Sequence, residues 1–205
     1  MIEFRNLISC VCLAALMISP AFCQPGCSLR IDKDSVKVYS CKTPDSKIKS
    51  IKTVFEVHAT SNQVIAMILD VNGYNNWQYH AINAHILEQK SSNELVYYLE
   101  IVSPWPASNR DLNVHLKIEH DKATDHINVY ANSIPDFIPE KKGIVRVPMS
   151  KSQWVVKPLS ASRLSVEFTM LVDPGGYVPA WLINMVAAEA PYESFRDFKK
   201  KIEKR

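Results

Sequence analysis

The sequence lacks the residue clusters that mark most metal sites and catalytic centres. Its six histidines are spread along the chain, and none lies four residues from another with a glutamate beside it, the spacing of a helical zinc site. No cysteines are grouped with the spacing of metal ligands. No acid, base and nucleophile are clustered either. We therefore expect no metal and no cofactor.

Strong charge, repeats and low-complexity segments are also missing. The formal net charge is +3, and no basic patch is interleaved with aromatic residues, so nucleic acid is not an expected partner. Gly175 and Gly176 precede an apolar segment but lack the lysine and further glycines of a phosphate-binding loop, which indicates a turn. No internal linker is evident. This organisation is typical of one domain.

The first residues of the chain form a separate segment. Arg5 precedes an apolar run at residues 7–18, and a small-x-small site ends at Cys23. Phe22 directly before Cys23 argues against a lipoprotein, and the run is short for an uncleaved membrane anchor, which is the alternative. We predict a signal peptide at residues 1–23 and a domain at residues 24–205, exported to the periplasm or the cell exterior.

Export affects the interpretation of Cys27 and Cys41. Apolar and polar residues alternate on both sides of a polar turn at residues 32–35. A hairpin centred on Asp34 places residue 27 opposite residue 41, close enough for a disulfide. Two free buried thiols are the alternative, which an oxidising compartment disfavours. We therefore predict a Cys27–Cys41 disulfide.

The end of the chain predicts a turn at residues 173–176 and then one long helix from Pro179 to about residue 201. Its first half is apolar nearly all round, and its second half narrows to a stripe. Pro191 is expected to kink it. A helix of this kind has to be covered by other parts of the protein. The stripe consists of Tyr192, Phe195, Phe198 and Ile202.

The middle of the chain alternates in the manner of β-strands. One strand is expected at residues 51–57, followed by a helix that begins with a capping box at residues 60–63. Strands joined by short turns predict an antiparallel meander. The expected fold is therefore α+β, with a curved antiparallel sheet that wraps around the C-terminal helix. The later strands are expected near residues 84–89, 94–102, 111–120, 126–132, 143–147, 153–157 and 164–172.

Three motifs in this order resemble the START-domain family, most closely its bacterial secreted members. The resemblance covers the chain from about Cys27 to its end and implies a helix-grip fold. It also implies a hydrophobic tunnel, between sheet and helix, for lipids or other apolar ligands. Relatives often carry tryptophan at position 27 and a basic residue at position 41, and both departures fit the disulfide. The motifs are Leu29-x4-Asp34-Ser35-Val36-Lys37-Val38-Tyr39, Pro104-Trp105-Pro106 with Asn109-Arg110-Asp111, and Asp173-Pro174-Gly175-Gly176 with Pro179-x-Trp181-Leu182-x-Asn184.

Ten residues are candidates for the lining of this tunnel. Arg110 could offer its fork of donors to a polar head group at the tunnel mouth, or form a structural ion pair. The large aromatic residues could form the cavity wall or plain core. The candidates are Trp77, Tyr97, Trp105, Arg110, Asp111, Arg146, Trp154, Glu167, Trp181 and Met185.

Two of the candidates depend on the register of the last strands. Turns at residues 148–151 and 159–162 would align Arg146, Gln153 and Glu167 in one row that faces water, opposite an apolar row that includes Trp154 and Val166. In that arrangement Arg146→Ala would cost less than about 1 kcal/mol. The alternative is a buried pair of Arg146 and Glu167 that orients a head group.

These observations predict a non-catalytic protein, expected to be monomeric, that carries or senses a lipid or other hydrophobic molecule. We expect a cavity of roughly 300–1,000 Å³ and transient contact with membranes. An enzyme of the cyclase or hydrolase type that uses the same cavity is the alternative, since related helix-grip folds include both. A weaker third possibility is a module that binds a protein partner through the loop at residues 104–109.

Overall fold

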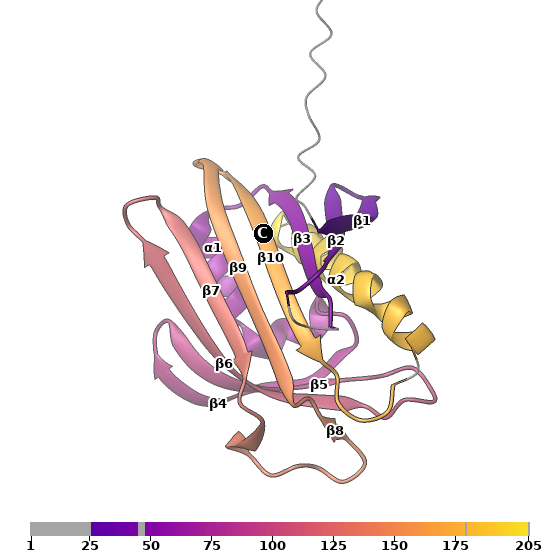
Figure 1. Cartoon of the computed structure of the whole chain (residues 1–205). Coiled ribbons are helices and arrows are strands. Elements are labelled where there is room, and N and C mark those ends of the chain that lie inside the picture. Colours follow the sequence, from indigo (N-terminus) through magenta and orange to yellow (C-terminus); the bar gives the residue numbers. More distant parts are fainter. Residues whose placement is uncertain (1–25, 45–47, 179, 205) are drawn as a thin grey trace, which may run out of the picture.

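The computed structural model describes residues 26–44, 48–178 and 180–204. In this part of the chain, ten strands form one sheet that curves around the C-terminal helix α2 (Ala180–Ile202), which confirms the predicted fold class (Figure 1). The predicted signal peptide lies outside the described residues. The strands are β1 (Cys27–Lys33), β2 (Val36–Cys41), β3 (Ser50–Val57), β4 (Ala81–Ser91), β5 (Glu94–Ile101), β6 (Arg110–Asp121), β7 (His126–Ser133), β8 (Val145–Arg146), β9 (Met149–Ser160) and β10 (Arg163–Asp173).

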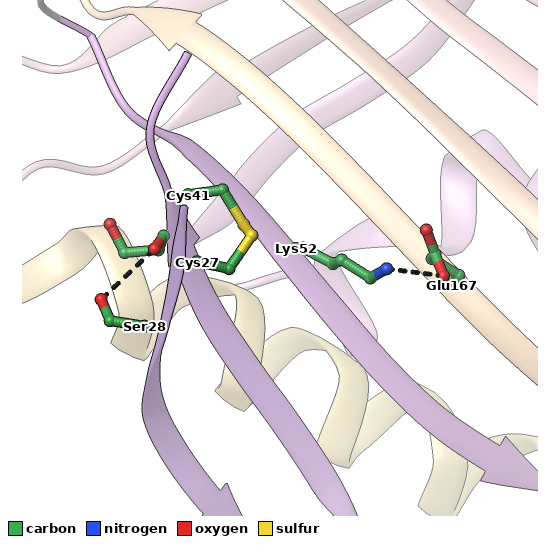
Figure 2. Close-up of a disulfide and its surroundings, with 6 residues drawn as sticks. Cys27, Ser28, Cys41, Lys52 and Glu167 are labelled. Atoms are coloured by element: carbon green, nitrogen blue, oxygen red, sulfur yellow. Dashed lines mark hydrogen bonds and ion pairs between the residues drawn. A yellow bond between two sulfur atoms is a disulfide. The ribbon is translucent and has the colours of Figure 1, made fainter. Parts of the chain in front are cut away.

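The β1–β2 hairpin has the pairing that the sequence predicts. Cys27 lies opposite Cys41, and a disulfide joins them with an S–S distance of 2.05 Å (Figure 2). The turn consists of Asp34 and Ser35, both with positive φ, as two-residue hairpin turns require. This turn is centred half a residue later than predicted. An irregularity in β1 between Leu29 and Ile31 compensates for the difference.

The sheet is more than a meander in chain order. The first three strands form one antiparallel unit, and β3 pairs with β10, the last strand, rather than with β4. Helix α1 (Ser61–Leu69) and the 3-10 helix η1 (Val71–Asn76) carry the chain from β3 to β4 at the far edge of the sheet. The expected capping box is present: Thr60 accepts from the backbone N–H of Gln63, whose side chain accepts from Thr60.

The predicted pairing of the strand at residues 143–147 is wrong. Only β8 forms there, and it pairs in parallel with the start of β6 instead of forming a hairpin with β9. Of the residues expected to form a turn before β9 (148–151), all but Pro148 belong to β9 itself, which begins at Met149. The last hairpin is centred one residue later than predicted, so Glu167 lies opposite Val155. That shift moves each partner by two residues and leaves every side chain on its predicted face.

An aromatic core fills the space between the sheet and the second half of α2. The ring of Trp154 lies 5.0 Å from that of Phe195 and 5.5 Å from that of Phe198, between ring centroids. The predicted stripe of α2, including Tyr192 and Ile202, is buried, as expected for a helix covered by the sheet. Pro191 lies inside α2. Helix α1 lies on the same side of the sheet and adds Val64, Met67 and Ile68 to the same core (Figure 1).

Candidate functional site

A cavity of about 640 Å³ lies between the inner face of the sheet and the first half of α2. The sheet contributes apolar side chains such as Leu112, Val114 and Met170 to its wall. The helix contributes a second apolar wall on the opposite side. That wall consists of Leu182, Ile183, Val186, Ala187, Ala188 and Ala190.

The cavity exists because side chains become small along elements that continue into the core. On the inner face of β9, Val156 and Trp154 are buried in the core, whereas Ser152 and Ser150 line the cavity. Helix α2 shows the same change, from the aromatic residues of its second half to the alanines of its first half. Since the spacing of helix and sheet is set by the large residues, the small ones opposite each other leave space between them.

Arg110 is the buried cation of the cavity wall. The residue is 7% exposed, and its guanidinium donates to the carbonyl oxygen of Ser108, to Ser103 Oγ at 3.4 Å and to the carbonyl oxygen of Gly175 at 3.5 Å. It forms no ion pair with an acidic residue in the part of the chain that the structure describes. Burial lowers the pKa of Arg110, because the charged form loses water.

Gly175 is needed at the position where it meets Arg110. Its φ is +64°, and a Cβ there would lie 2.7 Å from Pro148 Cδ, closer than real atoms approach. A hydrogen bond within the turn also stabilises it: the N–H of Gly175 donates to Asp173 Oδ1 at 3.0 Å. This turn therefore holds a carbonyl oxygen against Arg110 that a larger residue could not place there.

Asp111 and Arg146 lie on the other face of the sheet. Arg146 Nε donates to Asp111 Oδ1 at 2.7 Å and its Nη2 donates to Oδ2 at 3.1 Å. This hydrogen-bonded pairing with Asp111 raises the pKa of Arg146. The prediction that Arg146 faces water is therefore wrong: the segment that leads to β8 covers it, and its remaining donors bind the carbonyl oxygens of Pro135, Ile138 and Pro139.

Glu167 does face outward, as its place in the predicted polar row implies. Its carboxylate forms an ion pair with Lys52 on the neighbouring strand β3, with 2.8 Å between Glu167 Oε2 and Lys52 Nζ (Figure 2). The side chain of Glu167 is 37% exposed, so this pair lies at the surface of the sheet. The alternative of a buried Arg146–Glu167 pair inside the cavity is excluded by these positions.

The mouth of the cavity carries exposed apolar residues. The loop between β5 and β6 contributes Val102, Pro104 and Ala107 to the cavity wall, and Trp105 beside them is 88% exposed. After the turn at residues 173–176, Tyr177 is 89% exposed, and Ile183 on α2 is 40% exposed while it also lines the cavity. Large apolar side chains are rarely this exposed together without a partner.

The predicted site residues thus fall into different places. Tyr97 and Arg110 line the cavity, and burial raises the pKa of Tyr97. Trp77 and Trp154 lie 6.4 Å apart in the aromatic core instead, where Trp77 also contacts Phe198. Trp105 lies at the mouth, and Asp111, Arg146 and Glu167 lie on the outer face. The side chains of Trp181 and Met185 lie outside the described residues.

The sequence-based candidates do not include the small residues of the wall or several of its polar residues, such as Arg30, Lys49 and Gln78. Alternate serines on β9 and the alanines of α2 were the available signal, but they indicate a cavity only once they face each other. Gln78, which follows η1, also lines the cavity, and its Oε1 atom is buried without a hydrogen-bond partner in the described structure. It is an acceptor available to a ligand.

Neither a group of metal-ligating side chains nor a membrane-spanning helix is found among the described residues. Among them, no three His, Cys, Asp or Glu side chains are grouped so that they could hold a metal ion. None of the described helices combines the length and the apolar character needed to cross a membrane.

Comparison with known proteins identifies the family. Residues 28–204 match the START domain. An uncharacterized protein of Pseudomonas aeruginosa is 30% identical over 175 residues, 85% of each chain, and mouse phosphatidylcholine transfer protein is 26% identical over 88% of this chain and 86% of its own. The crystal structure of a STAR-related lipid transfer protein from Xanthomonas axonopodis superposes with a TM-score of 0.79 at 29% identity, over 86% of this chain and 98% of that one. The chain therefore belongs to the START domain family.

Proposed function

We propose that this protein binds a lipid or another hydrophobic small molecule in its cavity and carries it between membranes. The observation that carries this proposal is the cavity of about 640 Å³, which lies within the range of roughly 300–1,000 Å³ typical of ligand sites. Its walls are mostly apolar. Relatives named as a phosphatidylcholine transfer protein and a STAR-related lipid transfer protein support the same function.

The composition of the wall favours a carrier over an enzyme. Its described lining includes no Asp, Glu, His or Cys side chain. A cyclase or hydrolase that acts inside this cavity needs a group that takes or gives a proton near neutral pH. Tyr79 and Tyr97 do not meet this need, because burial raises the pKa of each further above neutrality. The bound molecule is therefore expected to leave the cavity chemically unchanged.

The mouth provides the means of contact with a membrane. Trp105, Tyr177 and Ile183 are exposed around it. Aromatic rings of this kind bind at the boundary between lipid and water, where one part of the ring is apolar and the other is wet. The protein would rest on a membrane transiently through these side chains while its ligand enters or leaves.

The proposed place of action is outside the cytoplasm. The apolar segment and small-x-small site of residues 1–23 support export, with cleavage at Cys23. The Cys27–Cys41 disulfide supports an oxidising compartment. The protein would then act as a monomer in the periplasm or at the cell exterior.

The test is to identify which lipids of its host the protein binds. Purified protein is stripped of bound lipid, incubated with a total lipid extract and isolated again, and the bound molecules are identified by mass spectrometry. One molecule per protein, recovered with unchanged mass, is the expected result. No retained lipid would contradict binding, and a hydrolysed or cyclised product would favour the enzyme.

A further inference from the structure

We propose that the ligand is an amphiphile with one apolar chain and an anionic head, and that Arg110 binds this head. The inference rests on the proposed function, because it names the class of molecule that occupies the same cavity. Three features support it: Arg110 has no acidic partner among the described residues, the charges around the cavity have one sign, and the cavity is small.

Arg110 is a buried cation with only neutral partners. Its acceptors are two carbonyl oxygens and one hydroxyl oxygen, and two of the three contacts are as long as 3.4 and 3.5 Å. Burial of a charge without an opposite charge is costly. By contrast, Arg146 on the outer face has the carboxylate of Asp111. A carboxylate or phosphate oxygen in the cavity would give Arg110 the charge-assisted hydrogen bonds that it lacks.

The charges of the cavity wall have one sign. Its charged lining residues are Arg30, Lys49 and Arg110, and the described lining contains no acidic residue to oppose them. Arg30 and Lys49 are exposed, so they lie at the rim, whereas Arg110 is buried. A wall of this kind attracts an anion, and its described residues offer no carboxylate to the ammonium group of a zwitterionic head. This distinguishes the expected ligand from phosphatidylcholine.

The size of the cavity limits the ligand to one chain. At about 30 Å³ for a group the size of a water molecule, a volume of 640 Å³ holds about twenty such groups. A fatty acid such as oleate has about this many non-hydrogen atoms. A lysophospholipid with a small head has about half as many again, so part of its head would lie at the open mouth. A phospholipid with two chains has far more. To enclose it, the sheet and the first half of α2 would have to move apart.

The position of Arg110 places the head close to the mouth. Ser103 and Ser108 belong to the loop between β5 and β6 at the mouth, and Gly175 belongs to the turn before α2. The apolar chain would then extend along the wall formed by Leu112, Val114 and the alanines of α2. A bound anion would compete for the same donors that now hold the loop and the turn.

The experiment compares ligands that share one chain and differ in the head. Binding of oleate, oleyl alcohol, oleoyl lysophosphatidate and oleoyl lysophosphatidylcholine to the lipid-free protein is measured by calorimetry. Either anion is expected to bind about tenfold or more tightly than the neutral or zwitterionic partner of the same chain. The two anions distinguish a carboxylate head from a phosphate head. Equal binding of oleate and oleyl alcohol, together with equal binding of the two lysophospholipids, would overturn the inference.

The variant Arg110→Met tests the residue itself. It is expected to bind oleyl alcohol as the native protein does and to lose the preference for the anion. The matched control is Arg163→Met, which removes an exposed arginine on β10. A preference that survives in Arg110→Met would overturn the role of Arg110. If that variant does not fold, Arg110→Lys is used, which keeps the charge but loses the fork of donors and should show a reduced preference.

Two further outcomes separate this inference from the proposed function. Displacement of oleate by equimolar dioleoyl phosphatidylcholine would refute the single-chain anion while leaving lipid binding intact. If none of these molecules and no lipid of a host extract binds, the proposed function itself fails. Anion-selective binding of one chain supports both.

Discussion

Asp111 and Arg146 form a two-point ion pair whose side chains are 1% and 4% exposed. The pair joins the start of β6 to β8, which runs parallel to it. Arg110, one residue before Asp111, points to the opposite face and lines the cavity. The ion pair on the outer face of the sheet thus holds the start of β6 in place, and this part of β6 carries Arg110 into the cavity wall.

The first prediction concerns the stability that this pair provides. Arg146→Ala leaves the carboxylate of Asp111 buried without a partner, so we expect a loss of about 3–5 kcal/mol in the free energy of unfolding. Denaturation with urea measures it. The control Arg163→Ala removes an exposed arginine and should cost less than about 1 kcal/mol. A similarly small loss in Arg146→Ala would show that the pair contributes little.

The second prediction concerns the disulfide between β1 and β2. It closes a loop with a sequence separation of 14 residues, for which the chain-entropy model gives about 3 kcal/mol of stabilisation. The double variant Cys27→Ser/Cys41→Ser should therefore unfold at a lower temperature and should be insensitive to reductant. A non-reduced digest of the native protein should contain the two peptides linked. Two free thiols in protein from its own host would contradict the prediction.

The third prediction concerns the space itself. Ala187→Phe places a ring in the cavity and should weaken ligand binding by about tenfold or more, with at most about 1–3 kcal/mol of destabilisation from overpacking. Ala123→Phe is the matched control, because Ala123 is exposed in the turn between β6 and β7. Ligand binding and thermal unfolding are measured for both variants. Unchanged affinity in a folded Ala187→Phe protein would place the ligand elsewhere.

The fourth prediction separates membrane contact from binding. Trp105→Ala should slow ligand transfer between vesicles by about tenfold, because a large aromatic side chain contributes on the order of 1.5–3 kcal/mol at an apolar surface. The affinity for the ligand in solution should stay the same. Phe137→Ala is the control, since Phe137 is exposed on the short 3-10 helix η2 (Pro135–Phe137) before β8. Equal transfer rates for the two variants would argue against docking through the mouth.

The sequence was most informative where structure is local. The pairing of Cys27 with Cys41 follows from a short hairpin, and the faces of Trp154 on β9 and Val166 on β10 follow from alternation within each strand. The stripe of α2 follows from helical periodicity. In each case the pattern depends only on neighbouring residues, so a small error in a turn did not change the face.

The position of Arg146 could not be found in this way. The prediction assumed that consecutive segments pair, but β8 pairs with β6, which ends well before it in the sequence. Nothing local to Arg146 indicates Asp111 as its partner. The cavity is likewise a property of two distant segments, since the serines of β9 and the alanines of α2 create space only where they face each other.

The most direct test of the whole account is native mass spectrometry of the protein purified without detergent from its own host. We predict a mass equal to that of the protein without residues 1–23 plus one lipid molecule, and the loss of that added mass in Ala187→Phe. A folded native protein that carries no added mass, and that stays empty after exposure to host lipids, would contradict the account.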